Sequence, residues 1–164
     1  MKKQNYNITF GGIGGQGILT ASELLGWAAM YDGYPVKKSE VHGMSQRGGS
    51  VESHVRFGKG VYSPLLGVGQ ADFLLCFHED EYERLGHFLN KDGVDLFGWL
   101  DKARTMIDNP KALNTAMTGV LAAYLPIKDA SWEKALETVF PEKLRQSNKA
   151  IFHKARNAAQ TELK

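Results

Sequence analysis

The chain has 164 residues, which suits one domain with a sizeable core, over residues 1–164. With 43% hydrophobic and 23% charged residues it has the composition of an ordinary soluble globular protein. The formal net charge of +2 argues against bulk binding to nucleic acid or to a membrane surface. The first ten residues lack the apolar stretch of a signal peptide, and no segment approaches the ~20 apolar residues of a membrane span. We therefore expect a cytoplasmic protein.

Alternation and apolar runs predict the strands. Residues 50–58 alternate most cleanly, because uncharged residues occupy every second position while Glu52, His54 and Arg56 share the other face. The Gly-Lys-Gly sequence at 58–60 is typical of a tight turn, so residues 61–66 are expected to return as the partner strand of a hairpin. We expect strands over residues 6–10, 35–41, 50–58, 61–66 and 71–77, the last one buried on both faces.

Helical periodicity and end signals predict the helices. Gly33 suits the end of the first one, and Asn109 and Ser131 are candidate N-caps of two later ones. Residues 91–108 indicate a short strand and a helix. The other helices are expected over residues 18–33, 79–90, 109–125, 131–140 and 141–160. This order predicts an α/β fold: a three-layer α/β/α sandwich with a largely parallel sheet, one antiparallel hairpin and a helical C-terminal third.

Two features have mainly structural interpretations. Between residues 141 and 164 six lysines and arginines stand against two glutamates. This stretch is either a solvated helix face, which we favour, or a docking face for an acidic partner. Cys76 is the only cysteine and lies in an apolar run, so we expect a core thiol rather than a nucleophile.

A glycine-rich motif follows the first strand and opens the first helix. Gly12, Gly14 and Gly17 fit G-x-G-x-x-G, which permits a tight turn and presents the unpaired N–H groups of a helix N-terminus. In a dinucleotide site Glu40, 23 residues after Gly17, would bind the ribose, and the lysines before it would favour a 2′-phosphate. The alternative is that the glycines allow close helix packing while the loop meets another protein. The extra Gly15 and the bulky Gln16 favour this alternative over nicotinamide binding.

Longer strings around these motifs resemble a known family. "GGIGGQGILTASELLGWAA" at 11–29, "SEVHGMSQRGGSVESHVRFG" at 39–58 and "YSPLL" at 62–66 are similar to the gamma subunit, or gamma domain, of the 2-oxoacid:ferredoxin oxidoreductases. Within this family the small subunit of indolepyruvate oxidoreductase is most similar. Arg47-Gly48-Gly49 fits the family's arginine–glycine–glycine loop, and the helical tail fits as well. Residues 93–110 depart from the family, which usually carries a further strand and a longer connection there.

The resemblance implies a role in the oxidative decarboxylation of 2-oxoacids to acyl-coenzyme A. The family uses thiamine diphosphate with Mg²⁺ and passes electrons through iron–sulfur clusters to ferredoxin. One cysteine cannot ligate a cluster that needs four, and Lys91-Asp92-Gly93 does not match the family's Gly-Asp-Gly motif for the thiamine site. The resemblance therefore implies that these cofactors lie on a larger catalytic subunit, and that this chain completes the enzyme but is inactive alone.

The loop at 39–58 is the second candidate site. Its histidines, His42 and His54, are 12 residues apart without a third ligand at metal-site spacing, so zinc is not expected. Arg47 offers a bidentate fork for a phosphate or carboxylate, and Gly48-Gly49 allow close approach of the main chain.

We expect the glycine loop and this loop to form one polar ledge, with Arg47 and His42 near the entrance for coenzyme A or the 2-oxoacid. The site residues of this ledge are Gly12, Gly14, Gly15, Gln16, Gly17, Glu40, His42, Arg47, Gly48 and Gly49. The alternative is that Arg47 pairs with Glu40 or Glu52 and only fixes the loop. His54 is expected at the surface or in an interface.

Two rival functions remain open: a stand-alone Rossmann-like dinucleotide oxidoreductase, and an interaction module without a share in an active site. When isolated, the chain is expected to form a homodimer that covers its partner-facing surface.

Overall fold

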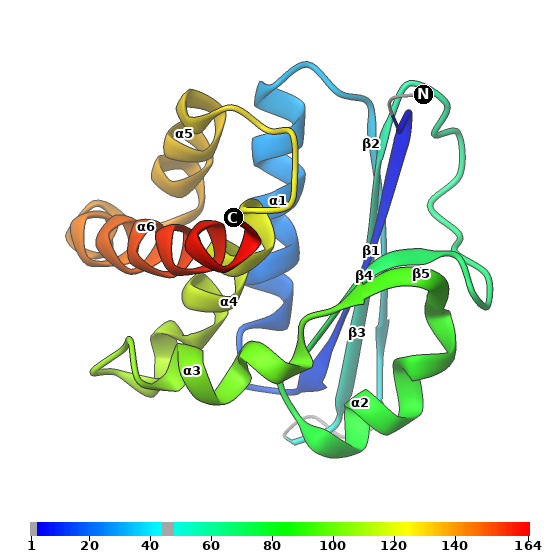
Figure 1. Cartoon of the computed structure of the whole chain (residues 1–164), viewed down its shortest axis with the longest axis horizontal. Coiled ribbons are helices and arrows are strands. Elements are labelled where there is room, and N and C mark those ends of the chain that lie inside the picture. The colour runs from blue at the N-terminus through cyan, green and yellow to red at the C-terminus, as the bar shows by residue number, and fades with distance from the viewer. Residues whose placement is uncertain (1–2, 44–47) are drawn as a thin grey trace.

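The computed structural model of the chain describes residues 3–43 and 48–164. A five-stranded sheet forms its centre, in the order β2-β3-β1-β4-β5 (Figure 1). β1 is parallel to β4 and β4 to β5, whereas β3 is antiparallel to both β1 and β2. Four strands therefore run in one direction, which confirms the predicted α/β fold with a largely parallel sheet. The strands are β1 (Asn5–Ile13), β2 (Val36–His42), β3 (Ser50–Gly58), β4 (Ala71–Cys76) and β5 (Leu89–Asp95).

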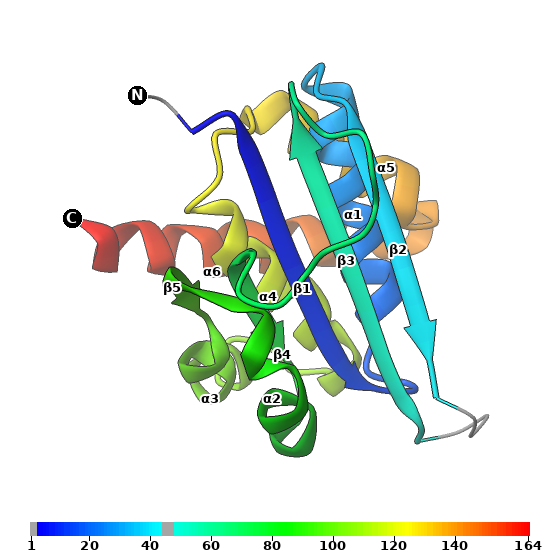
Figure 2. The same cartoon turned by 90° about the vertical axis from the view of Figure 1, so that its right-hand side faces the viewer.

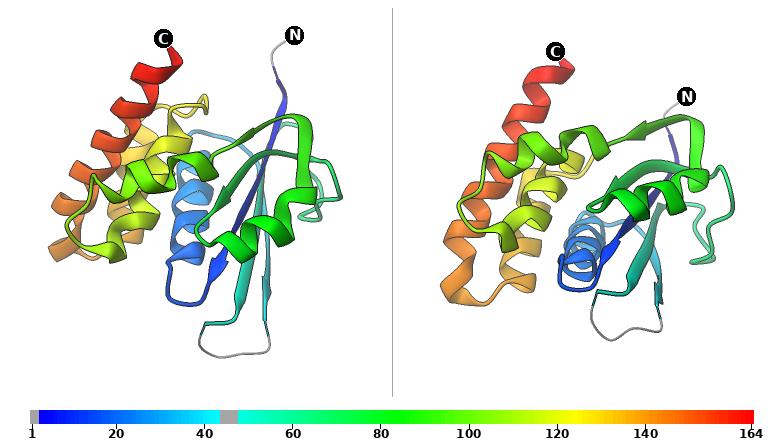
Figure 3. Two further views of the ribbon diagram at one scale, coloured as in Figure 1. Left: turned by 60° about the horizontal axis from the view of Figure 1, so that its bottom comes forward. Right: turned by 90° about the horizontal axis from the view of Figure 1, so that it is seen from below.

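Helices cover the two faces of the sheet unequally. α1 packs on β1, β2 and β3, on what is here called the first face of the sheet. α4, α5 and α6 pack behind α1 on the same side (Figure 1). On the second face α2 lies over β1 and β4 (Figure 3). The three layers and the helical C-terminal third are thus confirmed. The helices are α1 (Ile18–Tyr31), α2 (Glu79–Leu85), α3 (Leu100–Arg104), α4 (Leu113–Ala122), α5 (Asp129–Val139) and α6 (Glu142–Leu163), with 3-10 turns at Gly86–Phe88, Phe97–Trp99 and Pro110–Ala112.

The antiparallel hairpin exists, but its second member is not the predicted one. β3 pairs with β2, through the loop at 43–49, and residues 61–66 contain no strand. Pro64 has no N–H to donate to a ladder. Instead, the carbonyls of Ser63 and Leu65 each accept a hydrogen bond from Arg56 Nη1 at 2.8 Å. Residues 59–70 therefore form a loop that crosses the second face of the sheet (Figure 2).

The two faces bury different side chains. Ile8, Phe10, Val55 and Phe57 point to the first face and join the main core beneath α1. On the second face a smaller cluster forms where Leu85 of α2 packs on β4. Since residues in a strand alternate between faces, β4 contributes to both clusters, as its apolar run predicted.

Of the two predicted N-caps, Asn109 and Ser131, the structure confirms one. Asn109 Oδ1 accepts from Lys111 N at 3.0 Å, which confirms that cap. Ser131 is not a cap, because α5 begins two residues earlier, at Asp129. Its hydroxyl donates to Asp32 Oδ1 at 2.7 Å and so joins the end of α1 to α5.

The basic C-terminal stretch is partly neutralised within the fold. Lys149 of α6 pairs with Glu137 at 2.7 Å and with Glu133 at 3.1 Å, and Arg156 pairs with Asp129. These carboxylates belong to α5, so the charges hold two helices together. None of the helices in the described parts of the chain is both long and apolar enough for a bilayer crossing.

Candidate functional site

The glycine loop, residues 14–17, joins the carboxyl end of β1 to α1. Gly15 has a φ of 95° and Gly17 a φ of 75°, values that side-chain-bearing residues rarely adopt. A Cβ on Gly17 would also lie 2.4 Å from Asn114 Nδ2. Glycine is therefore required there both by conformation and by the contact with α4.

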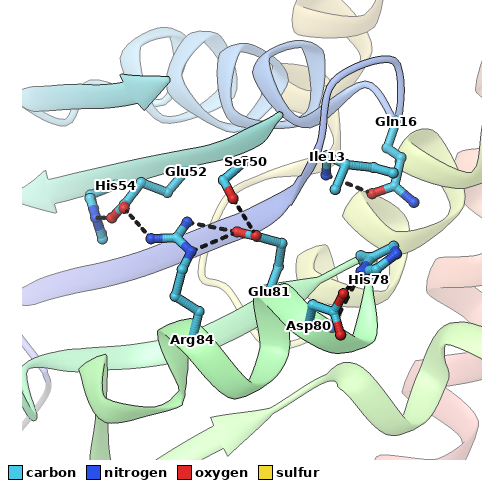
Figure 4. A network of polar contacts seen from close by, with 9 residues as sticks. All are labelled: Ile13, Gln16, Ser50, Glu52, His54, His78, Asp80, Glu81 and Arg84. Atoms are coloured by element: carbon cyan, nitrogen blue, oxygen red, sulfur yellow. Dashed lines mark hydrogen bonds and ion pairs between the residues drawn. The ribbon is translucent and has the colours of Figure 1, made fainter. Parts of the chain in front are cut away.

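Gln16 points back into this loop and stabilises it from behind. Its Oε1 accepts from Ile13 N at 2.9 Å (Figure 4). Its Nε2 donates to the carbonyl of Phe77 at 3.0 Å. Both ends of the amide are thus used within the protein. A Cβ on Gly12 would lie 2.7 Å from Oε1 of Gln16, so Gly12 leaves the room that this side chain needs.

Gly48 and Gly49, at the end of the 43–49 loop that connects β2 to β3, lie directly against the glycine loop. Gly14 N donates to the carbonyl of Gly49 at 2.9 Å, and Gly43 N donates to the carbonyl of Ser50 at 2.6 Å. A Cβ on Gly14 would come within 3.4 Å of Gly48 N. The two loops therefore meet main chain to main chain, which glycines permit because they carry no side chain.

A hollow of about 420 Å³, here called the loop hollow, opens between the two loops. Five of the ten predicted site residues line it, together with Gly43; they are Gly14, Gly15, Gly17, His42 and Gly49. Gly12 and Gln16 lie behind it, and Gly48 touches Gly14. Arg47 lies outside the described residues. Two further recesses, of about 400 and 770 Å³, flank the glycine loop on the sides of α2 and α6.

Glu40 is not part of this group. It lies on β2, and β3 separates β2 from β1, so Glu40 is two strand spacings, about 10 Å, from the strand that carries the glycine loop. Its Oε1 binds Lys38 Nζ at 2.6 Å, and its Oε2 lies 3.6 Å from His42 Nε2. The hydrogen bond from Lys38 is the main reason that the pKa of Glu40 lies below its ordinary value. Its charge is therefore neutralised locally.

The second face carries a polar network that the sequence did not predict (Figure 4). His54 is only 5% exposed, so its expected place at the surface is wrong. Its Nε2 binds Glu52 Oε2 at 2.7 Å, and its Nδ1 lies 2.9 Å from Thr9 Oγ1. A carboxylate only accepts, so Nε2 carries a proton and donates to Glu52. The polar face of β3 is buried because Arg84 of α2 and the ring of Phe88 contact Glu52 and His54.

Arg84 of α2 connects this group to a second carboxylate. Its Nη1 donates to Glu52 Oε1 at 2.9 Å, and its Nη2 donates to Glu81 Oε2 at 2.6 Å. Burial opposes the ionisation of Glu52, but the hydrogen bonds from Arg84 and His54 outweigh it and lower the pKa of Glu52. The sequence signal for this network was the pair Glu81 and Arg84, three apart on a helix next to the polar face of β3.

The described residues provide little for a metal or for thiol chemistry. Within residues 3–43 and 48–164 no three His, Cys, Asp or Glu side chains gather closely enough to hold a metal ion. Cys76 is buried, and burial, helped by Asp95 and Glu81, raises the pKa of its thiol to about 12. The thiol therefore stays protonated at neutral pH, as expected of a core cysteine.

Curated relatives match the chain over part of its length. The indolepyruvate oxidoreductase subunit IorB of Thermococcus kodakarensis is 53% identical over 91 residues, which cover 56% of this chain and 45% of the relative. The subunit of the same name from Archaeoglobus fulgidus is 49% identical over 86 residues, covering 52% and 42%. The chain thus spans less than half the length of these relatives.

Solved structures share the fold over nearly the whole chain. The gamma subunit of a keto/oxoacid ferredoxin oxidoreductase from Geobacter sulfurreducens gives a TM-score of 0.76 at 24% identity and covers 95% of this chain and 99% of that one. The 2-oxoglutarate:ferredoxin oxidoreductase of Magnetococcus marinus, solved with 2-oxoglutarate, coenzyme A and succinyl-CoA bound, gives 0.79 at 17% identity. It covers 98% of this chain and 32% of that one, so there the same fold is part of a longer polypeptide.

The family model for pyruvate ferredoxin/flavodoxin oxidoreductases matches residues 7–98, a span that contains both loops of the hollow. Because this match covers more than half of the chain, the protein belongs to the pyruvate ferredoxin/flavodoxin oxidoreductase family.

Proposed function

We propose that this chain is the small subunit of a thiamine diphosphate-dependent 2-oxoacid:ferredoxin oxidoreductase that acts on indolepyruvate or another arylpyruvate. The observation that carries the proposal is the 53% identity, over 91 residues, to a protein named as an indolepyruvate oxidoreductase subunit. The structure adds that the two loops with the most distinctive sequence meet at one hollow.

The cofactors belong to a larger catalytic subunit in this proposal. An iron–sulfur cluster needs about four cysteine thiolates, and this chain has one cysteine, whose thiol is buried and protonated. The residues of this chain thus do not fit a cluster. Thiamine diphosphate, Mg²⁺ and the clusters that deliver electrons to ferredoxin are assigned to the partner.

The role of this chain is to complete the mouth of the partner's active site. The loop hollow offers main-chain groups of both loops and the imidazole of His42, which lies at the end of β2. In α/β folds, ligands gather at the carboxyl ends of parallel strands, where this hollow lies. Arg47, between Gly43 and Gly49 in the sequence, adds a cation for the phosphates of coenzyme A or the carboxylate of the 2-oxoacid.

The catalytic subunit is proposed to dock on the loop at 59–70. Tyr62, Leu65 and Val68 are 86%, 74% and 73% exposed, although Arg56 and Ser39 hold the loop on the sheet by hydrogen bonds to its carbonyls. Large apolar side chains that are held rigidly in water are typical of a preorganised interface. In the Magnetococcus protein the same fold is joined to further sequence, which supports a partner that belongs to the same family.

Reconstitution tests the proposal. The catalytic subunit is purified with and without this chain, and ferredoxin reduction is measured with indolepyruvate and coenzyme A. The proposal predicts activity only in the complex. Equal activity without this chain would make it an interaction module, and a complex inactive with every arylpyruvate would refute the assigned substrate class.

Arg47→Ala tests the ledge within that complex. We expect the KM for coenzyme A or for the 2-oxoacid to rise about tenfold, because a charge-assisted contact is lost. The matched control is Lys91→Ala, which removes an exposed cation from a recess at the opposite edge of the sheet and leaves both KM values unchanged. If Arg47→Ala also leaves both unchanged, the ledge is wrong and Arg47 only fixes the loop.

The dinucleotide alternative receives no support from the geometry. Glu40 is paired with Lys38 on a strand that does not neighbour β1, and Gly14 N already donates to Gly49. Calorimetric titration of the chain with NAD(H) and NADP(H) is expected to give no saturable heat. Saturable binding of either cofactor would restore that alternative.

A further inference from the structure

The polar network on the second face ends at the 43–49 loop. The hydroxyl of Ser50, the first residue of β3, donates to Glu81 Oε1 at 2.6 Å (Figure 4). The carbonyl of Ser50 accepts from Gly43 N, and the carbonyl of the preceding Gly49 accepts from Gly14 N. Ser50 thus joins α2 to Gly43, and the adjacent Gly49 joins the start of β3 to the glycine loop.

The anchor of Ser50 on α2 is itself held firmly. Glu81 is 4% exposed, and its Oε2 accepts from both Nε and Nη2 of Arg84, at 3.0 and 2.6 Å. Arg84 in turn binds Glu52 on β3. Each carboxylate oxygen of Glu52 and Glu81 accepts at least one hydrogen bond. No buried oxygen of these two residues is therefore left unpaired to compete for the Ser50 hydroxyl.

The packing of α2 against the sheet fixes the position of Glu81 relative to Ser50. A Cβ on Gly11 of β1 would lie 2.2 Å from Leu85 Cδ1, so α2 rests directly on the main chain of β1. Leu85 is fully buried, and the ring of Phe88 packs edge-on against His54 at 4.7 Å between centroids. The helix is thus seated by apolar contacts, and Glu81 reaches Ser50 from a fixed position.

We propose that Glu81, Arg84 and Ser50 are positioning residues that fix Gly43 and Gly49, at the two ends of the 43–49 loop, relative to the glycine loop. Glu81 and Arg84 act through Ser50 and do not line the loop hollow, whereas Ser50 is one of its lining residues. The consequence for catalysis rests on the proposed function. A network that only stabilised the sheet would leave the mobility of the two loops unchanged when its last link is cut.

Hydrogen–deuterium exchange of the full chain tests this independently of any activity. Ser50→Ala cuts the link and is expected to raise the exchange rates of the Gly14 and Gly43 amides about tenfold or more. Ser50→Thr keeps the hydroxyl and restores slow exchange. The control is Tyr82→Phe, which removes a hydrogen bond between α2 and Asp95 outside the network and leaves both amides as in the wild type. Unchanged exchange in Ser50→Ala, or equal acceleration in Tyr82→Phe, overturns the proposal.

Kinetics of the assembled oxidoreductase test the link to the reaction. Ser50→Ala is expected to raise the KM for coenzyme A or the 2-oxoacid about fivefold while kcat stays within about twofold, because a misplaced contact weakens binding. Ser50→Thr is expected to restore the wild-type KM. Wild-type KM values in Ser50→Ala overturn the positioning role in catalysis. If the complex with the wild-type chain shows no activity with any 2-oxoacid, the proposed function is refuted. The exchange experiment alone then tests whether Ser50, Glu81 and Arg84 are positioning residues.

Discussion

Glu52 is a buried carboxylate whose negative charge is stabilised by hydrogen bonds from neighbouring side chains. Burial by itself would raise its pKa, but Arg84 and His54 donate to its two oxygens and lower the pKa below the ordinary value of 4.5. The folded state therefore binds a proton at Glu52 less readily than the unfolded chain does. Its contribution to stability is present above about pH 4.5 and is lost as the pH falls through the folded pKa.

Glu52→Gln measures this contribution. At pH 7 we expect the free energy of unfolding to fall by about 1.5–3 kcal/mol, the range for a hydrogen bond to a charged group. The difference from wild type should shrink below pH 4.5, because protonated Glu52 resembles glutamine. Urea unfolding between pH 3 and 8 provides the measurement. Glu83→Gln, at an exposed position of α2, is the control, and a pH-independent difference for Glu52→Gln would contradict the account.

Cys76 should be chemically silent in the folded protein. Its thiol is buried and its pKa is raised to about 12, so the reactive thiolate is scarce at pH 7. We expect Ellman's reagent to react with the native chain on the order of 100-fold more slowly than with the unfolded chain in guanidinium. Equal rates in the two states would show that the second face opens readily.

At the scale of the elements, two helix glycines have opposite surroundings. Gly119 lies where α4 crosses α6, and a Cβ there would be 2.4 Å from the carbonyl oxygen of Phe152 and 3.2 Å from Ala155 Cβ. Gly26, in the middle of α1, would place its Cβ in open space. The first glycine sets the distance between two helices, while the second only costs conformational entropy.

These two positions form a matched pair of substitutions. Gly119→Ala is expected to destabilise the protein by about 1–3 kcal/mol, because main-chain atoms of α6 must move. Gly26→Ala is expected to stabilise it by about 0.5–1 kcal/mol through helix propensity. Differential scanning calorimetry of both variants gives the answer. A stabilising Gly119→Ala would mean that α4 and α6 separate at little cost.

At the scale of the whole molecule, the helices cover the two faces of the sheet unequally, and the two faces have different roles. The helices on the first face form the main core together with the sheet, whereas the second face carries α2 and the exposed loop at 59–70 (Figure 2). The polar network lies on this second face as well (Figure 4). The first face can therefore hold the fold while the second face stays available for the proposed partner. This division supports docking of the catalytic subunit on the second face.

Leu65→Ser tests this docking surface. We expect affinity for the catalytic subunit to fall about tenfold or more, since an exposed apolar anchor is lost, while Tm stays unchanged. If the isolated chain dimerises through the same surface, sedimentation should show the dimer weakened as well. Leu163→Ser, at an exposed leucine at the end of α6, is the control. Equal weakening by both variants would contradict a specific role of the loop.

The element order, apart from the strand expected at 61–66, the helical tail and the positions of the two glycine-rich loops followed from local properties of the sequence. Periodicity, positive-φ glycines and caps such as Asn109 depend on residues close together in the chain, which explains why these predictions succeeded. The family resemblance rested on such local strings as well, and the family match over residues 7–98 confirmed it.

Only the tertiary structure decided which strand pairs with β3, how far Glu40 lies from the glycine loop, and what buries Glu52 and His54. Residues 50–58 have the same alternation whether β2 or residues 61–66 are their partner, so the sequence pattern alone could not choose. Glu52 meets its partner Arg84 across a sequence separation of 32 residues, after β4 and α2 have brought the two together. From the sequence alone, the polar face of β3 is expected to be exposed. Its burial depends on how the layers of the fold assemble, because the residues that cover it, such as Arg84 of α2, are distant in the sequence.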